Sequence, residues 1–237
     1  MRFPHPIGTI RDLWWYPVKS MLGVSSDALA LDRRGVIGDR WFAVRTAAGK
    51  FGSGKTTRRF QQIDDLFRFQ AHGLDGVPAI QFPSGVIMRA DDPTVHQVLS
   101  DVLEQPVMLV EEAAISHLDA GPVHLVTTAA LAWLQAALPT TAIDARRFRP
   151  NMVLAVPGCD LVDHQWIGRR LRIGGTVELH VRALAERCGM VGFHQSALPQ
   201  APAILRHLVQ HTGGMFGVYA DVVVPGVIHT DDPVLLR

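Results

Sequence analysis

The stretch Leu184-Ala-Glu-Arg-Cys-Gly-Met-Val-Gly-Phe-His-Gln195 follows a run of alternating apolar and polar side chains. That alternation, over residues 176–184, predicts a half-buried strand. The strand leads into Arg187-Cys188-Gly189, where a thiol lies beside a guanidinium in a glycine-containing loop. The positive charge favours the thiolate, which attacks electrophiles and binds soft metals. Because free cysteines are also common as small buried hydrophobes, the stretch alone leaves a functional and a packing role open.

The bulk composition excludes several classes of protein. The chain has 237 residues and a net charge of +1, so neither nucleic acid nor an anionic membrane is an expected partner. Two cysteines, Cys159 and Cys188, do not make a disulfide framework, and their expected reduced state fits a cytoplasmic location. No apolar run is long enough for a membrane span, and Met1–Ser20 lacks the apolar core of a signal peptide.

The pattern of apolar residues predicts about nine to twelve short strands and about four helices. The helices are expected over residues 60–69, from Pro93 to before Pro106, over residues 129–138 and after Pro202. Leu171–Ile173 and Thr176–Leu184 are expected to form a hairpin around Gly174-Gly175. Because strands and helices do not alternate strictly, we predict a β-rich α+β fold, with a β-barrel and a few peripheral helices. The polar stretch Glu111–Gly121 is the best place for a domain boundary.

Residues Gly49–Thr56 match the phosphate-loop pattern G-x-x-x-x-G-K-[ST]. In a nucleotide-binding protein, Lys55 would contact the β- and γ-phosphates and Thr56 would bind Mg²⁺. The polar pair Arg45-Thr46 precedes the loop, however, and no second strand ending in a metal-binding Asp is evident. A flexible loop between two elements is therefore the favoured interpretation, and nucleotide binding remains the lesser alternative.

Several short stretches could bind an anionic ligand, although each also has an ordinary structural explanation. Lys19-Ser20 follows a strand that ends at Pro17, and Arg40 follows Gly38-Asp39; a solvated turn and a surface ion pair are the ordinary alternatives. Thr127-Thr128 precedes a helix whose free N–H groups suit phosphate, or the pair simply caps that helix. The stretch 146–151 offers Arg146, Arg147, Arg149 and Asn151, or a solvated basic loop.

The ordered set of these motifs resembles a known family. Tyr16-Pro-Val-Lys-Ser-Met-Leu-Gly23 and Gly38-Asp-Arg-Trp41 resemble the N-terminal β-barrel segment that precedes MOSC domains. The MOSC domain itself, named for the C-terminal part of molybdenum cofactor sulfurase, is resembled by Phe148-Arg-Pro-Asn151, Trp166-Ile-Gly168, Arg187-Cys188 and Phe216-Gly-Val-Tyr-Ala220. The resemblance implies an N-terminal barrel segment over residues 1–115 and a MOSC domain over residues 116–237, with the cofactor between them.

The resemblance also implies a function and a set of site residues. It implies a protein that binds the molybdenum cofactor (Mo-molybdopterin), with Cys188 as the metal ligand, next to Arg187. The residues expected to hold the phosphate and pterin are Lys19, Ser20, Arg40, Thr127, Thr128, Arg149 and Asn151. The favoured activity is reduction of N-hydroxylated small molecules, with a protein electron donor; a cofactor or sulfur carrier without turnover is the alternative. The chain departs from many relatives at Met190-Val191-Gly192, where those relatives carry Thr-Thr, and at Asp231-Asp232-Pro233, where they often read Gly-Asp-Pro.

Overall fold

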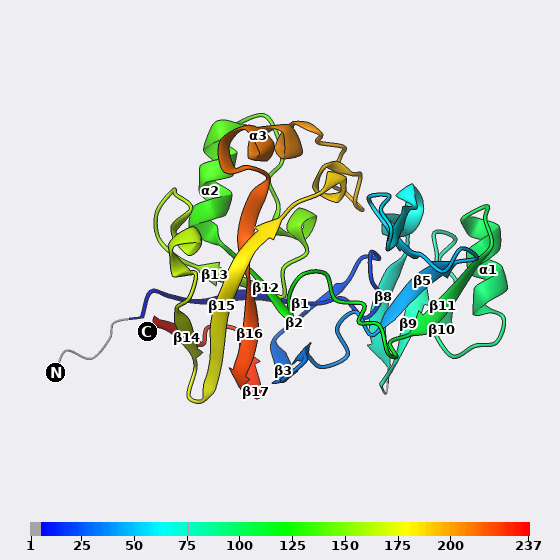
Figure 1. Ribbon diagram of the computed structural model, residues 1–237, viewed down its shortest axis with the longest axis horizontal. Coiled ribbons are helices and arrows are strands. Elements are labelled where there is room, and N and C mark those ends of the chain that lie inside the picture. The colour runs from blue at the N-terminus through cyan, green and yellow to red at the C-terminus, as the bar shows by residue number, and fades with distance from the viewer. Residues whose placement is uncertain (1–5, 75) are drawn as a thin grey trace.

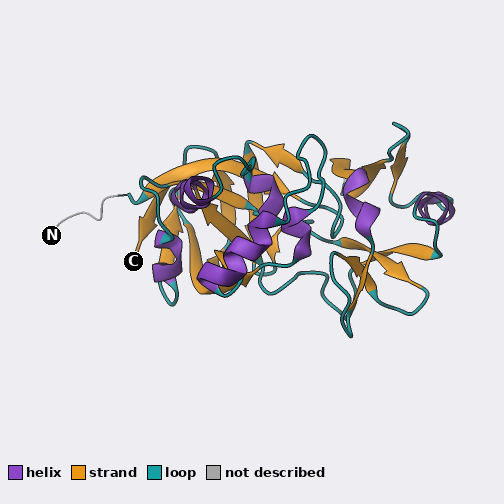
Figure 2. Ribbon diagram, turned by 90° about the horizontal axis from the view of Figure 1, so that it is seen from above, coloured by secondary structure: helices purple, strands orange, loops and turns teal. Residues whose placement is uncertain are grey.

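The computed structural model describes residues 6–74 and 76–237, and part of the stretch considered for a signal peptide lies outside these residues. The described chain is rich in strands, which lie in two groups along the long axis of the molecule (Figures 1 and 2). The prediction of a β-rich α+β fold with a barrel is confirmed. Within the described residues no helix is long and apolar enough to cross a membrane.

Seven strands close into a barrel. Its order is β13-β12-β16-β15-β14-β18-β1, and a further pairing of β1 with β13 closes the ring. All neighbours are antiparallel except β12 and β13. Strand β2, Val24–Ser26, extends the sheet beside β1. The barrel strands are β1 Gly8–Trp15, β12 Val123–Thr127, β13 Met152–Ala155, β14 Arg170–Ile173, β15 Val177–Glu186, β16 Met215–Val224 and β18 Pro233–Leu236.

Alternation along β15 explains why these residues close a barrel. Val177, Leu179 and Val181 are fully buried in its core, where each apolar side chain contributes roughly 1.5–3 kcal/mol. The residues between them point to the other face, as the sequence predicted. The turn between β14 and β15 contains Gly174–Thr176, so the hairpin has three connecting residues where two were expected.

Two smaller sheets and one helix form a second body, here called the small lobe (residues 42–111), which lies to the right in Figure 1. Its core is separate from that of the barrel. One sheet contains β5 Phe42–Thr46, β6 Phe51–Ser53, β7 Phe60–Gln62 and β11 Val107–Glu111, and the other β8 Gln70–Leu74, β9 Val77–Gln81 and β10 Ile87–Arg89. Helix α1, Val95–Val102, lies at the far end of this lobe (Figures 1 and 2).

The remaining elements cover the barrel. Helices α2, Thr128–Ala137, and α3, Ala203–Thr212, pack above it around an apolar cluster of their own (Figure 1). A three-stranded sheet is formed by β3 Ala28–Asp32, β4 Gly35–Val36 and β17 Gly226–His229. Short 3-10 helices occur at Asp64–Arg68, Ala145–Phe148, Val162–Trp166 and Gly189–Gly192.

The helix predicted over residues 60–69 is wrong. Phe60–Gln62 is strand β7, which pairs in parallel with β6, and only a 3-10 turn follows at Asp64–Arg68. The apolar spacing in this segment was read as a helical face, but the neighbouring strand supplies the backbone partners instead. The described residues therefore contain three α-helices.

The loop Tyr16–Gly23 joins the barrel to the small lobe. Val18 and Met21 are fully buried in the core of the small lobe. Single β-bridges pair Val18 with Phe42 and Leu22 with Gln70. The expected division at residue 115 stays a prediction, and the sheet pairing places the first strand, β1, in the same barrel as strands of the C-terminal half.

Candidate functional site

A cavity of about 440 Å³, here called the central cavity, lies where the small lobe meets the open end of β15. It draws residues from both bodies: Ser53 and Phe60 from the small lobe, and Leu184 and Tyr219 from the barrel. Six cationic side chains line it, against the two carboxylates Asp119 and Glu186; the cations are Arg40, Lys55, Arg59, Arg147, Arg149 and Arg187. This excess of positive charge suits an anionic ligand.

Cys188 lies on the wall of this cavity, at the point where β15 has ended. It precedes the 3-10 turn Gly189–Gly192, and its side chain is partly exposed. The sequence placed a thiol in a glycine-containing loop after a strand, and the structure agrees. The thiol therefore faces a ligand-sized space instead of the packed core.

Arg187 is held in place beside this thiol. Its Nη2 donates to the carbonyl oxygen of Phe148 at 2.6 Å, and its Nη1 lies 3.4 Å from Nε2 of His124. Burial, with a contribution from Arg187, holds the pKa of His124 well below its usual value, so the ring is neutral. The Nε of Arg187 is buried and has no partner within the described residues. The Arg187 guanidinium therefore keeps one N–H group that no described residue accepts from.

Lys19 and Ser20 reach the cavity from the loop Tyr16–Gly23. Lys19 is 2% exposed and donates to the carboxylate of Asp119, which lines the cavity. Burial lowers the pKa of Lys19, while Asp119 acts in the opposite direction. Ser20 has a φ of 66° and donates from Oγ to the carbonyl oxygen of Gly52 at 3.0 Å. Lys19 thus lies behind Asp119, and Ser20 lines the cavity directly.

Arg40 links Asp39 to the loop that carries Arg149. Its Nη1 donates to Asp39, and its Nη2 donates to the carbonyl oxygen of Arg149 at 3.1 Å. Burial opposes the charge, but Asp39 and Asp119 together raise the pKa of Arg40. Asp39 is fully buried and also accepts from the backbone N–H of Tyr16 at 2.9 Å. Arg40 is therefore a fixed, fully charged wall of the cavity.

Arg149 is held by contacts with Tyr16 and Met21. Its guanidinium carbon lies 4.2 Å from the centroid of the Tyr16 ring, and its Nη1 donates to the carbonyl oxygen of Met21. Burial, and then the charge of Arg40, lower the pKa of Arg149 to about 10. The residue lines the central cavity and also a second pocket on the side of Tyr16.

The structure does not bring the other predicted residues to the cavity wall. Thr127 caps helix α2, where its Oγ1 accepts from the N–H of Ala130 at 3.1 Å. Thr128 bonds to both backbone groups of Val156. The side-chain amide of Asn151 accepts from the N–H of His124 and contacts the carbonyl of Trp14, which ties β12, β1 and the start of β13 together. The side chains of Thr127, Thr128 and Asn151 thus form hydrogen bonds with backbone groups of the protein.

The sequence did not single out Arg59, Asp119, His124 or Tyr219 as site residues, although all four line the cavity. Arg59 donates to the carbonyl oxygens of Ser116 and Leu118, and its Nε has no partner within the described residues. The one available signal was the basic pair Arg58-Arg59 after the glycine-rich loop. Asp119 lies in a polar linker whose place in space no local pattern could give.

The glycine-rich loop forms part of the same wall, but not as a phosphate loop. The chain enters strand β7 after residues 54–59, so the helix that the motif requires is not formed. Ser53 and Lys55 line the cavity, and a Cβ on Gly54 would lie 2.0 Å from Cγ of Met190. The loop therefore packs against the turn that carries Cys188.

Within the described residues, no group of three or more His, Cys, Asp or Glu side chains could hold a metal ion. The sulfur of Cys188 is one soft donor atom on the wall of the central cavity. The cations and unpartnered guanidinium N–H groups around the thiol fit a ligand that carries phosphate.

Comparison with family models decides the relationship. The model described as the MOSC domain matches residues 103–235, and the one described as the MOSC N-terminal beta barrel domain matches residues 7–77. The chain belongs to the MOSC family. The resemblance stated from the sequence is thereby confirmed, and MOSC domains in general are associated with the molybdenum cofactor.

Solved structures support the fold of this MOSC protein. The YuaD protein from Bacillus subtilis matches with 15% identity and a TM-score of 0.54, over 97% of this chain and 94% of that one. YiiM from Geobacillus stearothermophilus matches with 21% identity and a TM-score of 0.38, over 49% of this chain and 54% of that one. The likeness to YuaD bears on the fold alone, and the TM-score of the match to YiiM is too low to support the fold. No curated protein matches the chain.

Proposed function

We propose that this MOSC protein binds the molybdenum cofactor in the central cavity and that Cys188 ligates the metal. One observation carries the proposal: a partly exposed thiol shares a cavity of about 440 Å³ with six cationic side chains. A thiolate is a soft ligand, and guanidinium groups bind phosphate through paired N–H donors. Family membership supports the same ligand.

The residues divide the work of binding. In this proposal Arg40, Arg59 and Arg187, which line the cavity, hold the anionic end through their charge. Ser20, from the loop Tyr16–Gly23, and Lys55, from the small lobe, also line the cavity. Because the contacts come from both bodies, binding would fix the small lobe against the barrel.

The proposed activity is reduction of N-hydroxylated small molecules. The bound cofactor would supply two-electron redox chemistry at its metal. Removal of the N-bound oxygen as water consumes two electrons and two protons, and the electrons come from an external donor protein. Arg187, held by Phe148, keeps positive charge beside the sulfur of Cys188, and His124 stays neutral because of its burial. Met190 follows in the turn where many relatives carry a hydroxyl residue, so the substrate meets an apolar wall there.

A direct experiment tests this proposal. The chain is produced in a host that makes the cofactor, and molybdenum is measured per protein by elemental analysis. The loaded protein is then given a chemical electron donor and an amidoxime. We expect about one molybdenum per chain and reduction of the amidoxime, with turnover lost in Cys188→Ser because a neutral hydroxyl is a poor ligand for a soft site. Absence of molybdenum from such a preparation would refute the proposal.

A carrier of the cofactor or of sulfur is the second candidate. The partial exposure of Cys188 favours it, because a group held there remains accessible to an acceptor protein. The two candidates differ in one result: full molybdenum loading with no reduction of amidoximes or hydroxylamines supports the carrier.

A further inference from the structure

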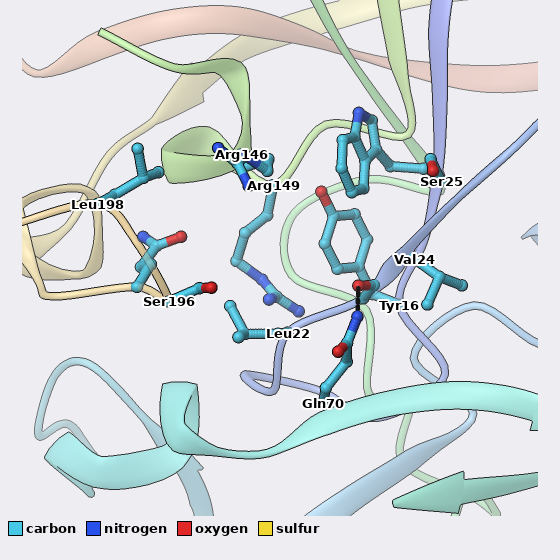
Figure 3. Close-up of a pocket in the computed structure, with 12 residues that line it drawn as sticks. Tyr16, Leu22, Val24, Ser25, Gln70, Arg146, Arg149, Ser196 and Leu198 are labelled. Atoms are coloured by element: carbon cyan, nitrogen blue, oxygen red, sulfur yellow. Dashed lines mark hydrogen bonds between the residues drawn. The ribbon is translucent and has the colours of Figure 1, made fainter. Parts of the chain in front are cut away.

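A second cavity, here called the side pocket, is lined by residues that include Tyr16, Arg149 and Leu198 (Figure 3). Its volume is about 260 Å³. Arg149 is the one residue that lines both cavities. Tyr16 and Arg149 lie face to face in it, while Leu22, Val24 and Leu198 supply apolar surface. The side pocket is therefore separate from the site proposed for the cofactor.

Three buried polar atoms in the side pocket have no partner within the described residues. They are Oη of Tyr16, Nη2 of Arg149 and Oε1 of Gln195. The three residues are 3%, 7% and 2% exposed. Buried polar groups in folded proteins are nearly always hydrogen-bonded, so these three atoms require partners that a molecule bound in the pocket could supply.

The orientation of these groups is fixed by their other contacts. The guanidinium carbon of Arg149 lies 4.2 Å from the centroid of the Tyr16 ring, and its Nη1 donates to the carbonyl oxygen of Met21. Its Nη2 is left without a partner within the described residues. Gln195 donates from Nε2 to the carbonyl of Met190 at 3.1 Å, which leaves Oε1 free as an acceptor. Burial raises the pKa of Tyr16, so its hydroxyl remains a donor at neutral pH.

We propose that the side pocket binds a small organic carboxylate. The cationic Nη2 of Arg149 and the hydroxyl of Tyr16 are two donors on residues that line the pocket, and a carboxylate has two oxygens to accept from them. Leu22, Val24 and Leu198 would cover an apolar body. A donor group on that body, such as a hydroxyl, would satisfy the free oxygen of Gln195. This site is independent of the function proposed for the central cavity.

Calorimetric titration of the full chain tests the proposal with benzoate, benzyl alcohol and inorganic phosphate. We expect one benzoate to bind per chain, with benzyl alcohol and phosphate at least tenfold weaker. Benzyl alcohol lacks the charge, and phosphate lacks the apolar body. Tyr16→Phe should weaken benzoate about tenfold, because it removes one hydrogen bond to a charged group. Val24→Trp, which fills the pocket, should abolish binding.

A matched variant separates the two cavities. Arg187→Lys alters the central cavity and should leave the affinity for benzoate unchanged. The proposal is overturned if benzoate does not bind at millimolar concentration, or if Tyr16→Phe and Val24→Trp both bind it as tightly as the wild type. Equal affinity for phosphate would identify a site for inorganic anions, and loss of benzoate binding in Arg187→Lys would place the ligand in the central cavity; either result also overturns it.

Discussion

The ammonium group of Lys19 donates a hydrogen bond to the carboxylate of Asp119, a residue 100 positions later in the chain. Lys19 is buried, whereas about half of the Asp119 side chain is exposed. Burial works against the charge of Asp119, but Lys19 and then Arg40 hold its pKa well below the usual range. The contact therefore places the linker before β12 against the loop Tyr16–Gly23.

Removal of the carboxylate should cost stability. We expect Asp119→Asn to lower the free energy of unfolding by about 2 kcal/mol, less than for a fully buried pair because Asp119 is half exposed. The double variant with Lys19→Met should recover part of this loss, since no buried charge remains unpaired. Urea unfolding of the wild type, both single variants and the double variant measures the effect. Additive losses would show that the two side chains are not coupled.

The buried carboxyl group of Asp163 should make the stability of the protein depend on pH. The residue is fully buried, and both carboxyl oxygens lack partners within the described residues. Burial raises the pKa of Asp163 to about 7, above the value of about 4 in an unfolded chain. The folded state then binds a proton that the unfolded state releases, so stability falls as the pH rises from about 4 to about 7.

Replacement of Asp163 by Asn should remove this pH dependence of stability. Asp163→Asn should leave the free energy of unfolding nearly unchanged at pH 4. At pH 8 it should raise that free energy by up to about 4 kcal/mol, because the pKa of Asp163 is about 7 in the folded state and about 4 in the unfolded chain. Urea unfolding at both pH values measures it, with Asp27→Asn, at an exposed position, as the control. An equal effect of Asp163→Asn at both pH values would contradict the assigned cause.

The two cysteines should differ in protection by the cofactor. Cys188 lines the central cavity, whereas Cys159 is exposed on a loop. We expect iodoacetamide to label both in cofactor-free protein and Cys159 alone in loaded protein, because a ligand in the central cavity covers Cys188. Mass spectrometry of the peptides reports both sites. Because Cys159 is exposed, Cys159→Ser should change stability by less than about 0.5 kcal/mol, not the larger change expected of a buried thiol. Equal labelling of Cys188 with and without cofactor would remove it from the site.

Gly54 tests the contact between the glycine-rich loop and the turn that carries Cys188. An added Cβ would lie 2.0 Å from Cγ of Met190, so Gly54→Ala must displace that side chain. We expect a loss of about 1–2 kcal/mol and lower molybdenum loading. Gly175→Ala, where nothing lies within 4 Å of the added carbon, is the control and should match the wild type. Normal loading in Gly54→Ala would mean that this packing does not shape the cavity.

Local patterns in the sequence predicted much of the barrel. The alternation around Leu179 identified β15, and the position of Cys188 after that strand followed from it. Helices α2 and α3 were found from their apolar faces and from the prolines beside them. Phe60 was misassigned because its strand is stabilised by β6, a partner that the local spacing does not reveal.

The composition of the site was harder to predict, because it depends on which loops meet. Thr127 has a hydroxyl group that could bind phosphate, but this hydroxyl accepts a hydrogen bond from the N–H of Ala130 and caps helix α2. Arg149 was expected at the cofactor, yet its left-handed backbone, with φ of 54°, accompanies a side chain that stacks on Tyr16. Asp119 gave no local signal, because its role depends on the approach of Lys19 from the other end of the chain.

The closure of the barrel by β1 and β18 has a consequence for biosynthesis. Gly8 of β1 pairs with Val234 of β18, so the first barrel strand in the chain pairs with the last one. The ring cannot be completed on the ribosome until residues 233–236 have been made, whereas the strands of the small lobe lie close together in sequence and can pair earlier. During translation, Gly8 and Thr9 of β1 therefore lack their β18 partners until residues 233–236 have been made, although β2 and β13 can pair with other parts of the strand earlier.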